Sequence, residues 1–100
     1  MSIPSVLGEG MITVEKTHDC CQAKVSGDRT EIAVFWALWQ TWLWPGWMDS
    51  LNHPHAISHR EAVRQIRDTG ELLIADSSGR YETATVAAIE KCRALGIVVE

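Results

Sequence analysis

Three histidines lie close enough in the sequence to bind a transition metal together. They occur as His53-x-His55-x-x-x-His59, and Pro54 stands between the first two. Imidazole nitrogens are common ligands of zinc, copper and nickel, but a stable site also needs further ligands at suitable spacing. No cysteine follows close by, and nothing in the sequence brings the distant His18 to this cluster. We therefore expect two loop histidines and one histidine at a helix start, with no bound metal or other cofactor.

A thiol nucleophile is the second chemistry to consider, because Cys20 and Cys21 closely follow His18. Such a nucleophile requires a base and a third group that orients the base, and the sequence does not place these groups together. We therefore expect no catalytic site. The third cysteine is Cys92, and an odd number with two adjacent members argues against disulfides. Residues 1–8 lack the basic and apolar regions of a secretory signal, so we expect a reduced, cytoplasmic protein.

Three arginines form a basic ridge on a predicted helix. Arg60, Arg64 and Arg67 stand at positions i, i+4 and i+7, which places them on one face. If segments 72–75 and 80–83 formed a β-wing after this helix, the pattern would be typical of a winged-helix regulator that binds DNA.

The charge balance argues against direct contact with nucleic acid. The chain has 9 Lys and Arg against 13 Asp and Glu, so its formal net charge is −4. A DNA-binding face needs an excess of positive charge to displace counterions from phosphates. Glu61 and Asp68 also stand beside the arginines. We expect a solvated face that serves as a secondary interface with an acidic rim on a protein partner.

One small domain must position these residues, because 100 residues with 46% apolar and 22% charged side chains form a single core. The expected fold is α+β and mainly α, with about three helices, a short N-terminal hairpin and minor strands. We expect helices at roughly 30–44, 58–69 and 83–95, hairpin strands near 12–14 and 21–25, and short strands at 72–75 and 98–99, after an irregular arm at 1–10.

Capping residues predict where the helices begin and end. Asp28 with Glu31, and Ser58 with Glu61, have the spacing at which the first side chain accepts a hydrogen bond from the third amide of the helix. Gly96 follows the last helix at the position where a left-handed residue ends many helices.

The segment between residues 32 and 44 is apolar on nearly all sides of the predicted helix. All five tryptophans fall between Trp36 and Trp47, and only Gln40 and Thr41 are polar within the segment. A membrane span is excluded because the helix would rise only about 20 Å, against roughly 30 Å of hydrocarbon. It also lacks the Lys/Arg-rich face of an interfacial anchor. The helix is therefore buried in the core of its own chain, or part of it faces another chain.

We expect contact with another chain, because each Trp buries on the order of 150–250 Å² and the other predicted elements offer only narrow apolar stripes. Tryptophan is enriched at binding hot spots, and a twofold dimer needs only one self-complementary patch. The expected assembly is an intertwined homodimer that leaves an aromatic patch for a different protein. The expected interface residues are Phe35, Trp36, Trp39, Trp42, Leu43, Trp44 and Trp47.

In length, helical content, the Trp segment at 36–47 and the helix at 58–69, the chain resembles the bacterial antiactivators that bind LasR, a LuxR-type quorum-sensing transcription regulator. The resemblance implies a homodimer that binds the ligand-binding domain of the regulator and blocks its dimerisation. We therefore expect a non-enzymatic regulatory protein that binds and blocks a partner of this kind. The alternatives are a winged-helix DNA-binding regulator and a phage-type inhibitor of another bacterial complex.

Overall fold

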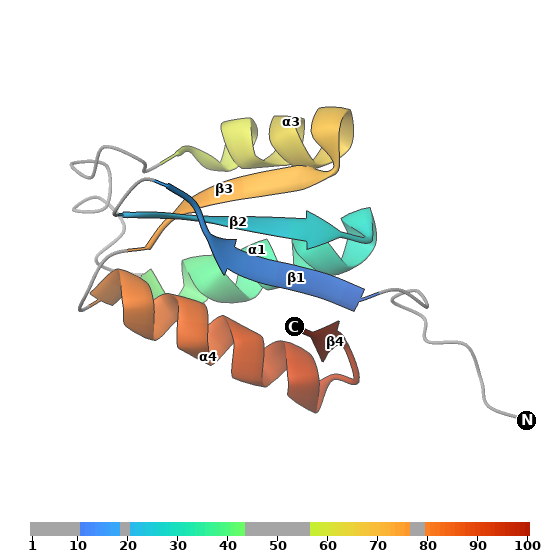
Figure 1. The fold of residues 1–100 in the computed structure, drawn as a ribbon, viewed down its shortest axis with the longest axis vertical. Coiled ribbons are helices and arrows are strands. Elements are labelled where there is room, and N and C mark those ends of the chain that lie inside the picture. Colours follow the sequence, from blue (N-terminus) through green and yellow to red (C-terminus); the bar gives the residue numbers. More distant parts are fainter. Residues whose placement is uncertain (1–10, 19–20, 44–56, 77–79) are drawn as a thin grey trace, which may run out of the picture.

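The computed structural model describes residues 11–18, 21–43, 57–76 and 80–100 (Figure 1). These residues form three helices and a four-stranded mixed sheet, which confirms the predicted α+β, mainly α, class. The predicted arm at 1–10 lies outside the described residues. The elements in chain order are β1 (Met11–Lys16), β2 (Gln22–Gly27), α1 (Arg29–Leu43), α3 (His59–Thr69), β3 (Glu71–Ala75), α4 (Arg80–Ala94) and β4 (Val98–Val99).

The strands are arranged in the order β3-β2-β1-β4. β1 and β2 form the predicted antiparallel hairpin, β3 adds antiparallel to β2, and β4 adds parallel to β1. β2 ends at Gly27, opposite Ile12, where the backbone has a φ of +129° and leaves no room for a Cβ beside the Met11 carbonyl oxygen. Only glycine adopts this backbone conformation without strain.

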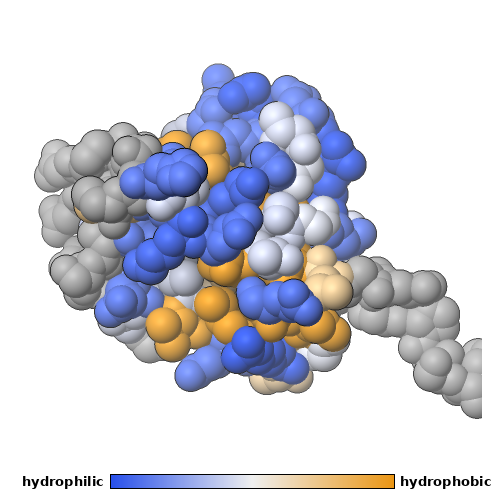
Figure 2. Space-filling model, in the orientation of Figure 1, coloured by the Kyte–Doolittle hydropathy of each residue, from blue (hydrophilic) through white to orange (hydrophobic). Residues whose placement is uncertain are grey.

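One face of the sheet carries the core and the other is largely polar. Side chains alternate along each strand, so that Ile12, Val25, Leu72 and Ile74 are buried on the same face. α1 lies behind the sheet in Figure 1, and α4 packs against α1 beside β1 and β4. Figure 2 shows polar atoms over α3 and β3, whereas apolar atoms gather towards α4.

The predicted capping interactions are present. The Asp28 carboxylate accepts a hydrogen bond from the Glu31 amide at 3.0 Å, and the Ser58 hydroxyl accepts one from the Glu61 amide at 3.1 Å. Gly96 has a φ of +91°, and the next amide, that of Ile97, donates to a carbonyl in the last turn of α4. The predicted bounds of all three helices lie within three residues of the observed bounds.

The β-wing considered for segments 72–75 and 80–83 is not formed. α4 begins at Arg80, three residues before its predicted start at Thr83, so segment 80–83 is helical. β3 does not form a hairpin with that segment, because it pairs with β2 as the edge strand of the sheet. The apolar run over 72–75 correctly predicts a strand, but not the partner strand.

Two of the tryptophans are core residues of the single chain. Trp36 and Trp39 are each 2% exposed and stack with ring centroids 5.3 Å apart, and Phe35 is also fully buried. The Trp39 indole N–H donates to the Thr85 hydroxyl of α4 at 3.2 Å, and the Trp36 indole N–H donates to His59 Nδ1 at 3.0 Å. The assignment of Phe35, Trp36 and Trp39 to an interface is therefore corrected, because the helices and the sheet together cover more apolar surface than the individual stripes suggest.

The side chains of Trp42 and Leu43, and the residues Trp44 and Trp47, lie outside what the structure describes. Their assignment to an interface stays a prediction. Among the described residues, no helix has both the length and the apolar run needed to cross a bilayer.

Replacing Trp39 by alanine should destabilise the monomer. Removing a buried aromatic ring of this size costs about 3–5 kcal/mol of unfolding free energy, because the surrounding core cannot collapse into the space. Urea denaturation measures this loss, with Ala37→Ser on the exposed side of α1 as the control. A loss no larger than that of the control would contradict the assignment of Trp39 to the core.

Candidate functional site

The arginine ridge lies on the exposed face of α3, but most of its charge is paired within the helix. Arg64 makes two hydrogen bonds to the Glu61 carboxylate and lies 3.7 Å from Asp68, which also pairs with Arg67 at 3.0 Å. The Arg64 guanidinium and the neighbouring Gln65 amide lower the pKa of Glu61 to about 2. The face is therefore mixed in charge, and Arg60 is its one arginine without a described ionic partner.

The histidine cluster is only partly described. His59 begins α3, as predicted, and its Nδ1 accepts the hydrogen bond from the Trp36 indole. His53 and His55 lie outside the described residues. Within the described ranges, no group of three or more His, Cys, Asp or Glu side chains could hold a metal ion.

The thiols are not arranged as a nucleophilic site in the described part of the chain. Cys21 is half-buried and Cys92 is fully buried, and both are thiols. Burial, with the nearby Glu31 carboxylate, raises the pKa of Cys92 to about 11, so this thiol stays protonated at neutral pH. Cys20 lies outside the described residues, and His18 is exposed.

Glu31 is a buried carboxylate in the first turn of α1. It is 1% exposed, and no group of the described residues donates a hydrogen bond to its Oε1. Burial, and then the negative charge of Asp28, raise the pKa of Glu31 above its ordinary value of 4.5. An ionised carboxylate at this position is destabilising, because water is excluded and no salt bridge to Glu31 is found within the described ranges.

A groove of about 220 Å³ separates β1 from α4. Its apolar lining comes from two strands and one helix: Val14 of β1, Ala23 of β2, and Val86 and Ile89 of α4. Val86 is 49% exposed at the rim, so its side chain is open to contact with a bound group. The apolar part of the lining is suited to binding an apolar group.

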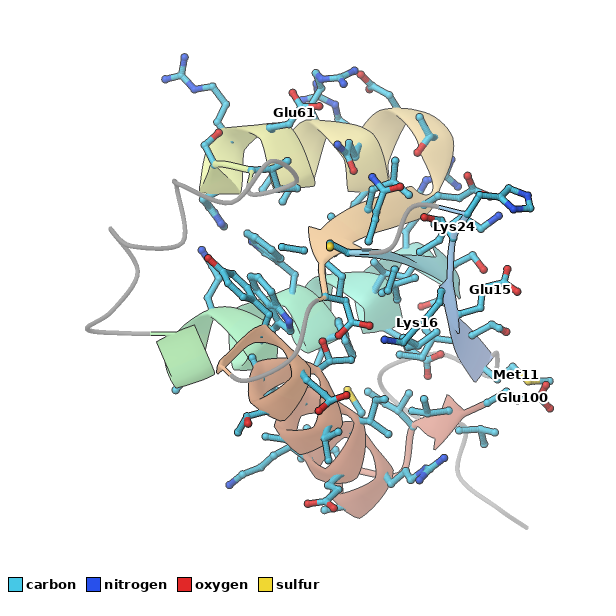
Figure 3. All side chains as sticks on the ribbon, turned by 60° about the vertical axis from the view of Figure 1, so that its left-hand side comes forward. Met11, Glu15, Lys16, Lys24, Glu61 and Glu100 are labelled. Atoms are coloured by element: carbon cyan, nitrogen blue, oxygen red, sulfur yellow. The ribbon has the colours of Figure 1, made fainter. Side chains whose placement is uncertain are left out.

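The polar lining of the groove is mostly acidic. Asp76 is 4% exposed and pairs with Lys16 at 3.2 Å, while Glu15 and Glu82 add two more carboxylates. Figure 3 shows Glu15 and Lys24 together on the outer side of the hairpin, where they pair at 3.8 Å, with Lys16 directed to the other side. Lys16 thus pairs with Asp76, and Lys24, which lies outside the lining, pairs with Glu15.

The edge of β1 beside the groove is only partly paired. β4 is two residues long, and Glu100 extends it by accepting from the Val14 amide at 3.2 Å and donating to the Ile12 carbonyl at 3.0 Å. Figure 3 shows Glu100 near the start of β1. The register with β2 turns the Val14 carbonyl and the Lys16 amide to this same edge, and neither has a main-chain partner among the described residues.

Sequence reasoning missed this groove entirely. Its lining joins β1 and β2 to α4, and this contact between segments far apart in the sequence does not follow from local patterns. Comparison of the chain with protein-family models, curated proteins and solved structures finds no match.

Replacing Glu31 by glutamine should make stability less dependent on pH. The raised pKa means that the folded state holds this proton more tightly, so its contribution to stability falls as pH rises from 4.5 through the raised value. The gain in Tm of Glu31→Gln over the parent should therefore grow over that range and then level off. Thermal unfolding across the pH series measures it, with exposed Glu90→Gln as the control; a difference independent of pH would contradict the burial of an unpartnered charge.

Proposed function

We propose that this chain is a non-enzymatic regulatory protein that acts in the cytoplasm by binding another protein. The observation that carries the proposal is the apolar groove between β1 and α4, with the exposed side chain of Val86 on its rim. A pocket of this kind can take an apolar side chain of another protein. A regulator that blocks its partner needs only such a surface and no chemistry.

A transcription regulator is the first class of partner to test, because the chain resembles small antiactivators of LuxR-type regulators in its size and Trp-bearing helix. A phage-type inhibitor of another bacterial complex would use the same kind of surface. The DNA-binding alternative is less well supported, because the segment 80–83 expected to form a wing is helical. In addition, Arg64 and Arg67 on α3 are paired with acidic side chains.

Two valines on exposed helix positions allow a matched test of the surface. Val86 lies on the groove and is 49% exposed, whereas Val63 lies among the arginines of α3 and is 43% exposed. Val86→Asp should abolish recovery of a partner from host cells, because it places a charge in the apolar contact, and Val63→Asp should retain it. Affinity purification with quantitative mass spectrometry compares both variants with the parent.

Loss of the partner only in Val63→Asp would assign the interface to the arginine face and contradict the use of the groove. Recovery of no protein above an unrelated bait would contradict the proposed function itself. Circular dichroism of both variants checks that the fold is kept.

Self-association is a separate prediction. The homodimer follows from aromatic rings that one chain cannot cover, and that reasoning no longer applies to Trp36 and Trp39. Light scattering over a concentration series should give twice the chain mass of 11.1 kDa if the remaining tryptophans dimerise the protein. A constant monomer mass would contradict the homodimer without affecting the groove.

A further inference from the structure

The imidazole of His59 joins the start of α3 to the buried face of α1. Its Nδ1 lies 3.0 Å from the indole nitrogen of Trp36, which is 2% exposed, whereas His59 is open to solvent. An indole N–H can only donate a hydrogen bond, so Nδ1 must accept it and carries no proton. The contact therefore requires the neutral imidazole with its single proton on Nε2.

We propose that this hydrogen bond is an acid-sensitive contact, which holds the first turn of α3 against α1 while His59 is neutral and releases it when His59 is protonated. An imidazole takes up its second proton at about pH 6.5, and both of its nitrogens are then donors. The Nδ1–H group would face the indole N–H, donor against donor. The inference depends neither on the groove nor on a partner.

The indole is the fixed side of this contact. Trp36 stacks on Trp39 with ring centroids 5.3 Å apart, and the Trp39 N–H donates to Thr85 of α4. His59 is the first residue of its helix, and its exposed ring can turn towards water. We therefore expect protonation to displace the imidazole and the first turn of α3, and to leave the indole ring in the core.

The charged groups around His59 offer a protonated imidazole no ionic partner within the described ranges. The pocket that His59 lines is otherwise basic and apolar, with Arg60, Val63, Arg64 and Arg67 as its other lining residues. Glu61 of the same helix is bonded to Arg64 and Gln65. The free amides at the start of a helix also disfavour a cation there.

The elements packed against α3 supply no counter-charge either. α1 carries its charged residues in its first turn, where Arg29 donates to the Ile66 carbonyl, and no described ion pair joins Glu31 to His59. Glu71 of β3 pairs with Lys24. Nothing in these described elements would therefore hold a protonated His59 in its present position.

The protonation state of the two imidazole nitrogens tests the first step. Nitrogen NMR of the isolated full chain at about pH 8 should show His59 with an unprotonated Nδ1 and a protonated Nε2. A protonated Nδ1 under these conditions would overturn the inference, because the hydrogen bond to Trp36 could not then form.

Hydrogen exchange tests the release. The reporters are the Trp36 indole N–H and the amides of Glu61 and Ala62, which Ser58 holds at the start of α3. At about pH 5 they should exchange about tenfold faster in the parent than in His59→Asn, because the asparagine oxygen can take the place of Nδ1 and accepts at any pH. At about pH 8 the two proteins should agree. Comparison at equal pH removes the intrinsic effect of acid on exchange.

Two further variants make the exchange result specific. His18→Gln removes another exposed histidine and should behave as the parent does. Trp36→Phe identifies the indole signal and removes the donor, so acid should no longer affect the two amides relative to His59→Asn. Equal exchange of parent and His59→Asn at about pH 5, or loss of the acid effect in His18→Gln, would overturn the inference. If His59→Asn does not fold by circular dichroism, the nitrogen spectrum of the parent still decides.

Discussion

The position of α4 depends on the buried indole of Trp39. Its ring is buried and lies near Tyr81 of α4, with ring centroids 6.4 Å apart, and its N–H donates to the Thr85 hydroxyl of the same helix. Loss of that acceptor would remove the hydrogen bond of a buried donor, at a cost of about 1–3 kcal/mol. The hydrogen bond therefore favours one placement of α4 against α1. Thr85 also lines the groove, so the same contact holds one wall of the groove in place.

The groove is the space that this packing leaves open. α4 covers the sheet as far as β1, but β4 ends after Val99 and pairs only with the first half of that strand. At the opposite edge of the sheet, the α3 side chain of Gln65 accepts a hydrogen bond from the Leu73 amide of β3. α3 thus satisfies a main-chain group on the β3 edge of the sheet.

Local patterns predicted the helices and strands because their determinants are close in sequence. Asp28, Ser58 and Gly96 each act on residues within one or two turns, and all three behave as their types require. The environment of Trp36 and Trp39 was predicted wrongly, because burial depends on how α1, α4 and the sheet combine. The groove was missed for the same reason. Its residues come from β1, β2 and α4, and the strand order that joins them is a non-local property.

Hydrogen exchange of the chain, alone and in a complex recovered from host cells, is the most direct measurement of the central claim that a partner binds the groove between β1 and α4. We expect slower exchange in the complex for the segments that line the groove, residues 14–16 and 82–89. We expect unchanged exchange for α3, which carries the arginines. Slower exchange in α3 with no change at the groove would contradict the claim.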